Sequence, residues 1–147
     1  MRRSLSYPGL ALLVWLLSAH AGCFSEPGAG AGETIEWVAS HAEGLRRARE
    51  IGRPALVFFT ADWCGPCVEM KKSIWSERRV VAAARQFVAI YLDVDKEPEA
   101  FAGYKVRGIP AVIFLSPQGE RVATFSGERS AANLARQMNA VVAKYSN

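Results

Sequence analysis

The residues best suited to chemistry are two cysteines separated by two residues, in the motif Trp63-Cys64-Gly65-Pro66-Cys67. The motif follows the apolar run 55–60 and precedes a helical pattern. A sulfur at the start of a helix lies beside free backbone N–H groups and the positive end of the helix dipole, which favour an anion. We therefore expect the pKa of Cys64 to lie below that of a free thiol, which makes its nucleophilic thiolate available near neutral pH.

Cys67 lies one helical turn after Cys64, close enough to form a disulfide with it. The Cys64 thiolate can attack the disulfide of a partner, and Cys67 can then attack Cys64 to release the reduced partner. We expect Gly65 to let the chain turn tightly, and Pro66 suits the first helical turn, where its missing N–H is no loss. The spacing thus predicts dithiol-disulfide exchange.

Two other interpretations of the pair are open. It could be half of a zinc site, which would need two further ligands from His20, Cys23 and His41. It could also be a structural disulfide that never turns over. The Gly-Pro pair at a helix start, preceded by a tryptophan, disfavours the second interpretation. We expect neither a metal ion nor another cofactor.

The elements that must position this motif alternate along the chain. The continuous apolar run 55–60 is typical of a strand buried on both faces. Ser40 and Glu43 form a capping box at the start of a helix. The expected strands are 34–38, 55–60, 87–94, 111–115 and 121–126, and the expected helices are 41–51, 64–75, 76–85, 98–104 and 130–145. This order predicts an α/β fold with a mixed sheet and helices on both faces.

Length and charge limit the function further. The 147 residues suit one domain, and 50% apolar with 22% charged residues is a globular composition. The formal charge is +4, and removal of Arg2 and Arg3 leaves 16 basic against 14 acidic residues, a net charge of +2. The basic residues are interleaved with acidic ones, so we expect no nucleic-acid partner. Three cysteines are too few for a disulfide-rich scaffold.

The N-terminus has the pattern of a secretory signal peptide over residues 1–22. Arg2 and Arg3 form a basic start, the apolar run 10–17 follows, and Ala19-His20-Ala21 offers small residues for cleavage. The apolar run is too short to span a bilayer, which takes about 20 residues. A buried helix at the start of the domain is the alternative, which the Gly/Ala-rich sequence that follows disfavours.

Cys23 allows two interpretations of the cleavage. Ala21-Gly22-Cys23 resembles a bacterial lipobox, in which the cysteine is lipidated and becomes residue one. Cleavage after Ala21 would instead leave Cys23 as a loose thiol. We expect the lipid anchor, with residues 23–32 as a Gly/Ala-rich tether and 33–147 as the domain. Both interpretations place the domain outside the cytoplasm.

The motif Trp63-Cys64-Gly65-Pro66-Cys67 after an apolar strand resembles the active site of the thioredoxin family. Gly108-Ile109-Pro110 resembles the cis-proline loop of that family, and Gly127 matches in place before the last helix. The resemblance covers residues 34–145 and implies a thioredoxin fold. It is closest to secreted thioredoxin-like domains, among them the C-terminal periplasmic domain of DsbD-type thiol:disulfide interchange proteins.

The resemblance implies roles for further residues. A cis peptide bond before Pro110 would place the Ile109 backbone across from Cys64, where an incoming peptide could pair with it as an added strand. Trp63, with Gly65 and Pro66, would then contact the substrate. Core packing is the alternative for Trp63. We expect two other tryptophans, Trp37 and Trp75, to lie in the core.

The departures from the family concern Cys67. Thioredoxins carry a buried acid in the strand six residues before the first cysteine, where this chain has Phe58, and a lysine on the next strand, where it has Tyr91. A drier, more apolar pocket under Cys67 should raise the pKa of that thiol. Asp62 is a hypothetical substitute that would act through water. A solvated loop carboxylate is the alternative for Asp62.

The resemblance implies a monomeric, periplasmic protein-disulfide reductase. Its partners would be disulfide-containing exported proteins and, upstream, a membrane thiol-disulfide electron donor. A disulfide oxidase or isomerase is the alternative within this chemistry. A thioredoxin-like module that binds a peptide or a metal without turnover is the alternative outside it.

Overall fold

The computed structural model describes residues 34–125 and 130–145. The expected signal peptide at 1–22, the tether at 23–32 with Cys23, and Gly127 lie outside the described residues. The strands are β1 (Trp37–Val38), β2 (Ala55–Thr60), β3 (Val88–Asp93), β4 (Ala111–Leu115) and β5 (Arg121–Phe125). The helices are α1 (His41–Ile51), α2 (Gly65–Ser73), α3 (Arg78–Ala84), α4 (Pro98–Gly103) and α5 (Ala131–Val142).

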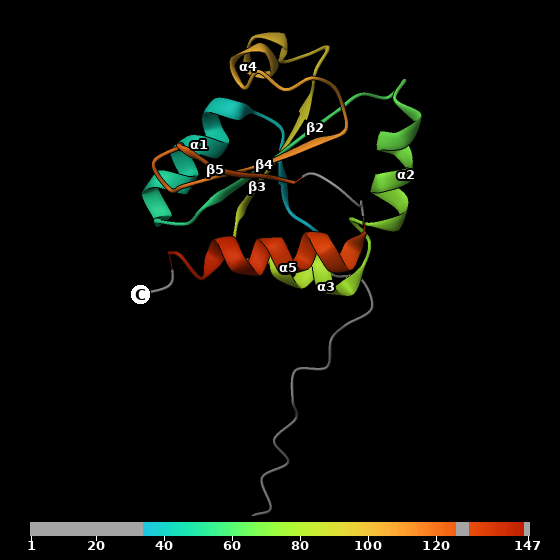
Figure 1. Cartoon of the computed structure of the whole chain (residues 1–147). Coiled ribbons are helices and arrows are strands. Elements are labelled where there is room, and N and C mark those ends of the chain that lie inside the picture. Colours follow the sequence, from blue (N-terminus) through green and yellow to red (C-terminus); the bar gives the residue numbers. More distant parts are fainter. Residues whose placement is uncertain (1–33, 126–129, 146–147) are drawn as a thin grey trace, which may run out of the picture. The chain divides into compact units, whose positions relative to one another are not determined.

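The strands form one mixed sheet with the order β1-β3-β2-β4-β5. β1, β3 and β2 run parallel, whereas β4 is antiparallel to β2 and β5 is antiparallel to β4. Figure 1 shows β2, β3 and β4 in the middle of the fold, with helices around them. The predicted fold class is confirmed. Because β2 and β3 are parallel neighbours, the loops that follow them lie at the same edge of the sheet.

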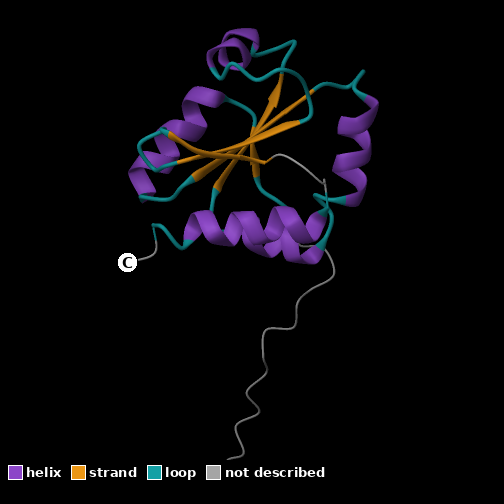
Figure 2. Cartoon of the chain, viewed as in Figure 1, coloured by secondary structure: helices purple, strands orange, loops and turns teal. Residues whose placement is uncertain are grey.

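Apolar side chains are buried on both faces of the sheet, as the continuous run in β2 predicts. Leu56 and Phe58 face a core to which α2, α3 and α5 contribute Met70, Val80 and Leu134. Val57 and Phe59 face the other core, where α1 contributes Ala48 and Phe101 of α4 packs against the cluster. Figure 2 shows the sheet in orange between these purple helices. The core therefore holds the end of β2, and with it the start of α2, in a fixed position.

The helix starts follow the predicted caps with one difference. The Ser40 hydroxyl accepts a hydrogen bond from the Glu43 N–H at 3.4 Å, and the Ser130 hydroxyl caps α5 in the same way. The second half of the predicted capping box is wrong. The Glu43 carboxylate binds Arg46 and Arg47 instead, because two cations on the same helix face offer stronger partners than a backbone N–H.

Most elements are shorter at their ends than the sequence predicts, and the largest differences are in β1, α2, α3 and α5. Only Trp37 and Val38 of the run 34–38 pair with β3. The helix expected over 64–75 ends at Ser73, after which Ile74 and Trp75 are buried in the core at 6% exposure each. The backbone N–H groups of Ile74 and Trp75 both donate to the Met70 carbonyl. This shared acceptor ends the regular helix and turns the chain toward the core. No helix within residues 34–125 and 130–145 is long and apolar enough to cross a membrane.

Candidate active site

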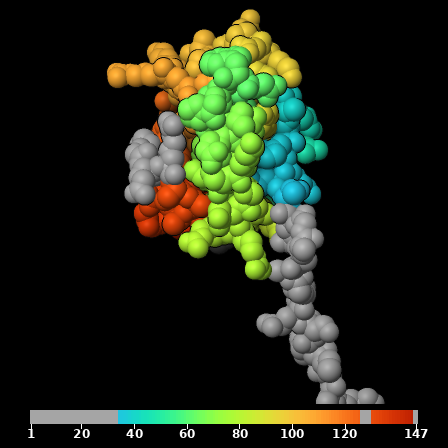
Figure 3. Space-filling view, turned by 90° about the vertical axis from the view of Figure 1, so that its right-hand side faces the viewer, coloured from blue at the N-terminus to red at the C-terminus, as the bar shows by residue number. Residues whose placement is uncertain are grey.

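The two cysteines lie at the junction between β2 and α2. Cys64 is the N-cap of α2, with extended backbone angles of −85° and 98°. Its Sγ accepts a hydrogen bond from the Cys67 N–H at 3.3 Å, and its carbonyl accepts one from the Val68 N–H at 3.1 Å. The sulfur therefore occupies the place where a helix end stabilises an anion, as the spacing predicts. Figure 3 shows α2, coloured green, along the surface of this side of the molecule.

Cys64 and Cys67 form a disulfide, with Cα atoms 5.2 Å apart. Cys67 is fully buried, whereas Cys64 keeps 5% of its surface exposed. Both sulfurs belong to a small cluster with Ala61, against which Val94 and Ile109 pack. Solvent, and therefore an incoming partner, reaches Cys64 first.

The loop before β4 lies against this cluster. The Ile109–Pro110 peptide bond is cis, as the resemblance implies, and Pro110 is buried. Ile109 packs against the cluster that holds Cys64 and Cys67. The fold thus brings together two segments of the chain, 61–67 and 109–110, that are more than 40 residues apart in the sequence.

Trp63 lies outside the core, with 70% of its surface exposed. Its indole Nε1 donates a hydrogen bond to the Asp95 carboxylate at 2.8 Å. Core packing of Trp63 is therefore wrong, whereas Trp75 is buried and Trp37 packs against the core, as expected. Sequence reasoning missed Asp95. Its only signal is the position of 93–98 directly after β3, because the loops after β2 and β3 meet at one edge of the sheet.

Gly65 and Pro66 open α2 as its first two residues. The reason expected for Gly65 is wrong: it does not adopt a positive φ, and a Cβ added there would meet no atom within 4 Å. The extended backbone of Cys64 makes the turn into the helix. Gly65 instead leaves open space beside the disulfide.

Phe58 and Tyr91, the two positions that depart from the thioredoxin pattern, are neighbours in the register of β2 and β3. Phe58 is fully buried, and its ring lies 5.8 Å from Tyr91 and 5.1 Å from Trp75. The Tyr91 hydroxyl accepts a hydrogen bond from Lys71 Nζ at 3.2 Å. The sheet below α2 is therefore aromatic, with one lysine at its edge.

Asp62 lies largely in solvent, with 89% of its side chain exposed, and its Oδ1 is 3.7 Å from Lys71 Nζ. This fits the solvated-carboxylate alternative better than a position under Cys67. Its role in proton transfer stays a prediction.

These residues can be compared with known proteins. A family model described as thioredoxin-like matches residues 36–117, which include both cysteines and Pro110. The chain belongs to the thioredoxin-like family. Its resemblance to the thioredoxins and its fold class are confirmed.

Relatives of this thioredoxin-like chain are named for thiol-disulfide chemistry. It is 31% identical over 112 residues to a protein named thiol:disulfide interchange protein TxlA homolog from Synechocystis, which covers 76% of this chain and 62% of that protein. It is 30% identical over 141 residues to thiol:disulfide interchange protein DsbD from Ralstonia nicotianae, which covers 90% of this chain and 23% of that protein. The chain thus spans less than two thirds of these relatives.

A solved structure gives the same fold. The solution structure of a thioredoxin from Thermus thermophilus superposes with a TM-score of 0.67 at 26% identity, over 76% of this chain and 89% of that one. Together with the Cys64–Cys67 disulfide, these comparisons support thiol-disulfide exchange as the chemistry of this thioredoxin-like site.

The acidic, histidine and cysteine side chains of the described residues bear on whether the chain could also hold a metal ion. Among the described residues, no group of three or more His, Cys, Asp or Glu side chains could hold a metal ion, and His41 binds the Tyr104 hydroxyl at 2.7 Å.

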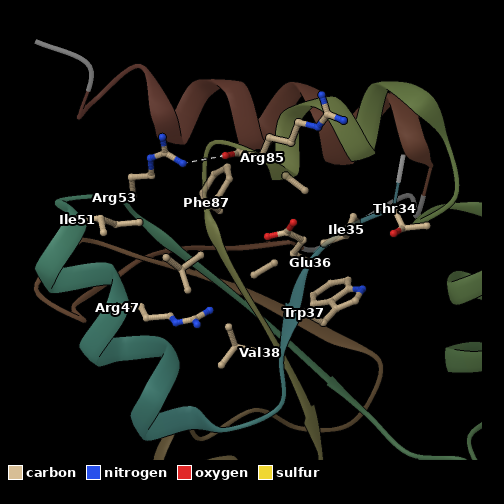
Figure 4. A pocket seen from close by; sticks show the side chains of 13 residues that line it. Thr34, Ile35, Glu36, Trp37, Val38, Arg47, Ile51, Arg53, Arg85 and Phe87 are labelled. Atoms are coloured by element: carbon tan, nitrogen blue, oxygen red, sulfur yellow. Dashed lines mark hydrogen bonds between the residues drawn. The ribbon is translucent and has the colours of Figure 1, made fainter. Parts of the chain in front are cut away.

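A hollow of about 480 Å³ lies between β1, α1 and the end of α3. Figure 4 shows Arg47 and Arg53 at this hollow, and Arg53 donates to the Arg85 carbonyl. Neither cysteine of the thioredoxin-like site lines it.

Proposed function

We propose that this chain is a protein-disulfide reductase in which Cys64 is the nucleophile and Cys67 resolves the mixed disulfide. One observation carries the proposal: Cys64 Sγ caps α2 and accepts the Cys67 N–H, while Cys67 is buried behind it. A thiolate at Cys64 keeps this hydrogen bond and gains the helix dipole, both of which lower the pKa of a thiol.

The reaction transfers two electrons and two protons to the substrate. The Cys64 thiolate attacks one sulfur of a substrate disulfide, a mixed disulfide forms, and the other substrate sulfur leaves as a thiolate that takes up a proton. Cys67 then loses its proton and attacks Cys64 Sγ. The Cys64–Cys67 disulfide forms, and the first substrate sulfur leaves and is protonated. A dithiol donor must reduce the pair before the next cycle.

The loop before β4 and the exposed indole provide a surface for the substrate peptide. The Ile109 backbone beside the cysteine cluster can pair with an extended peptide, as an added strand does. Trp63 offers an apolar face next to Cys64, and Gly65 leaves room for a backbone to approach. An extended peptide segment that carries an accessible disulfide fits such a surface.

The proposal also includes the direction of the reaction, which is reduction of the substrate, and the location of the protein, which is outside the cytoplasm. The Gly-Pro pair between the cysteines resembles the reducing members of the family, and the basic and apolar pattern of residues 1–22 supports export. A reductase outside the cytoplasm needs a donor of electrons, so we include a membrane thiol-disulfide relay protein as the upstream partner. Exported proteins with disulfides are the substrates.

Insulin reduction tests the activity. We expect the reduced full-length chain to cleave the interchain disulfides of insulin, and we expect Cys64→Ser to abolish this activity. Cys67→Ser should stall as a mixed disulfide through Cys64. If the wild-type chain is as inert as both serine variants with dithiothreitol and with a thioredoxin-reductase donor, the chain is a binding module instead.

The reduction potential of the Cys64–Cys67 pair tests the direction. We expect a value near that of thioredoxin, about −270 mV, measured by equilibration with glutathione or dithiothreitol. A value of about −120 mV, as in strong oxidants, would make the chain an oxidase.

A further inference from the structure

The resolving step requires ionisation of Cys67, which its buried position disfavours. The role inferred for Lys71 rests on the proposed function, in which Cys67 attacks Cys64. Cys67 must become a thiolate to attack Cys64, yet it is fully buried beside Ala61, Val94 and Ile109. Burial among apolar groups disfavours the charged form of a thiol. A positive charge close to Cys67 would offset this effect.

Lys71 is the cation whose position on α2 meets this need. It lies four residues after Cys67, so the two side chains share one helix face, with Cβ atoms about 5–6 Å apart. Side chains of a helix lean toward its N-terminus, which carries the Lys71 side chain back along α2. The 3.7 Å distance from its Nζ to the carboxylate of Asp62, a residue that precedes α2, agrees with this direction.

The ammonium group of Lys71 is held in place from the sheet. Its Nζ donates to the Tyr91 hydroxyl at 3.2 Å and lies 5.7 Å from the centre of the Tyr91 ring. That ring is fixed in turn by Phe58 and Trp37, at 5.8 and 5.9 Å. Only 30% of the Lys71 side chain is exposed, so water screens its charge less than that of an open surface lysine.

We propose that the Lys71 ammonium, held by the Tyr91 hydroxyl, is the positive charge that favours the Cys67 thiolate during resolution. Lys71 does not touch the reacting sulfur of the substrate, so it is a positioning residue that acts through Cys67. Phe58 occupies the β2 position where thioredoxins have a buried acid, so Lys71 would favour the Cys67 thiolate by its positive charge and not by accepting the proton.

The other charged groups near this site are more exposed or paired elsewhere. Asp62 opposes Lys71, but 89% of its side chain is in solvent, where its charge is strongly screened. The Asp93 carboxylate accepts the Asp95 N–H and lies 3.8 Å from Lys96. On α2 itself, Glu69 and Lys72 are exposed. Among these groups, Lys71 is the half-buried cation on the helix face of Cys67, whereas the less exposed Asp93 has Lys96 as its own partner.

Titration of Cys67 alone tests the inference. The chain has three cysteines, so Cys23→Ser with Cys64→Ser leaves Cys67 as the only thiol. The chemical shift of its labelled β-carbon follows its ionisation without a reagent that must reach a buried sulfur. We expect Lys71→Gln to move the midpoint upward by about 0.5 to 1 pH unit.

Lys72→Gln is the matched control, because it removes the same charge from the neighbouring, exposed position of α2. We expect it to leave the midpoint unchanged, and we expect Lys71→Arg to restore the wild-type value. Tyr91→Phe removes only the hydroxyl that holds Lys71 and should give a smaller upward shift. If Lys71→Gln does not fold, Lys71→Arg and Tyr91→Phe decide: an unmoved midpoint in Tyr91→Phe contradicts the inference.

Kinetics separate this inference from the proposed function. In the chain with both active-site cysteines, Lys71→Gln should slow the release of a trapped substrate from Cys64 at neutral pH by about three- to tenfold, since a midpoint shift of one unit is a factor of ten in thiolate. If the Cys67 midpoints of Lys71→Gln and Lys72→Gln are equal while the wild-type chain reduces insulin, the role of Lys71 is overturned and the proposed function stands. An inert wild-type chain overturns the proposed function whatever the titration gives.

Discussion

The indole Nε1 of Trp63 donates a hydrogen bond to the Asp95 carboxylate at 2.8 Å and joins the loop after β2 to the loop after β3. A tryptophan with 70% of its surface exposed would otherwise turn freely about its side-chain bonds. The bond to Asp95 restricts the indole and presents its apolar face beside Cys64. A restricted aromatic surface loses less entropy when a peptide docks on it.

Asp95→Ala tests this restraint. We expect KM for insulin to rise about two- to fivefold with kcat little changed, because a hydrogen bond of this kind contributes about 1 kcal/mol. Steady-state kinetics measure the effect. Asp95→Asn is the control, since its amide oxygen still accepts the indole N–H and should keep the wild-type KM. An unchanged KM in Asp95→Ala would show that the bond does not serve docking.

Phe58→Ala tests the aromatic core under α2. Phe58 is fully buried, and its ring contacts Trp37, Trp75 and Tyr91. We expect the free energy of unfolding to fall by about 3–5 kcal/mol, measured by denaturant melts of the oxidised chain. Trp63→Ala, at an exposed position, should change it by less than about 1 kcal/mol. Equal losses in the two variants would contradict the assigned core.

Much of the fold could be predicted because its signals are local. The buried run of β2, the Ser40 and Ser130 caps and the position of Cys64 before α2 each follow from a few adjacent residues. The end of α2 could not be predicted in this way. Its pattern continues to Trp75, but burial of Ile74 and Trp75 against the sheet turns the chain at Ser73.

Gly44→Ala tests the close contact of α1 with the sheet. A Cβ at Gly44 would lie 2.4 Å from Cδ1 and Cγ1 of Ile90. We expect a net loss of stability, because overpacking costs about 1–3 kcal/mol and the better helix propensity of alanine offsets about 1 kcal/mol of it. Gly103→Ala in α4 meets no atom within 4 Å and should be neutral or stabilising. Thermal melts compare the two, and a stabilised Gly44→Ala would contradict the packing.

His41 gives a pH dependence of stability. Burial lowers the pKa of His41 from its ordinary value of 6.5, and Glu97 raises it by a smaller amount. The unfolded chain therefore binds the proton first, so stability is full above pH 6.5 and falls as the pH drops toward the folded pKa. We expect denaturant melts at about pH 7.5 and about pH 5.5 to show this loss. His41→Gln should show less of it, and an equal loss in both chains would contradict the assignment.

The contacts that shape the site could not be predicted from the sequence. Trp63 and Asp95 are 32 residues apart, and Lys71 and Tyr91 are 20 apart. Each pair meets only because β2 and β3 are parallel neighbours, and no local pattern reports which loop side chains then touch. Only the resemblance predicts the cis bond at Pro110, since the residues around it do not require it.

The central claim is that Cys64 is a thiolate stabilised by the start of α2. Titration of the reduced Cys67→Ser chain, with Cys23→Ser to remove the remaining thiol, measures the pKa of Cys64 directly. We expect a pKa of about 7, well below the value of about 8.5 for a free thiol. A pKa at or above about 8.5 would contradict the account, because the helix end would then provide no activated nucleophile.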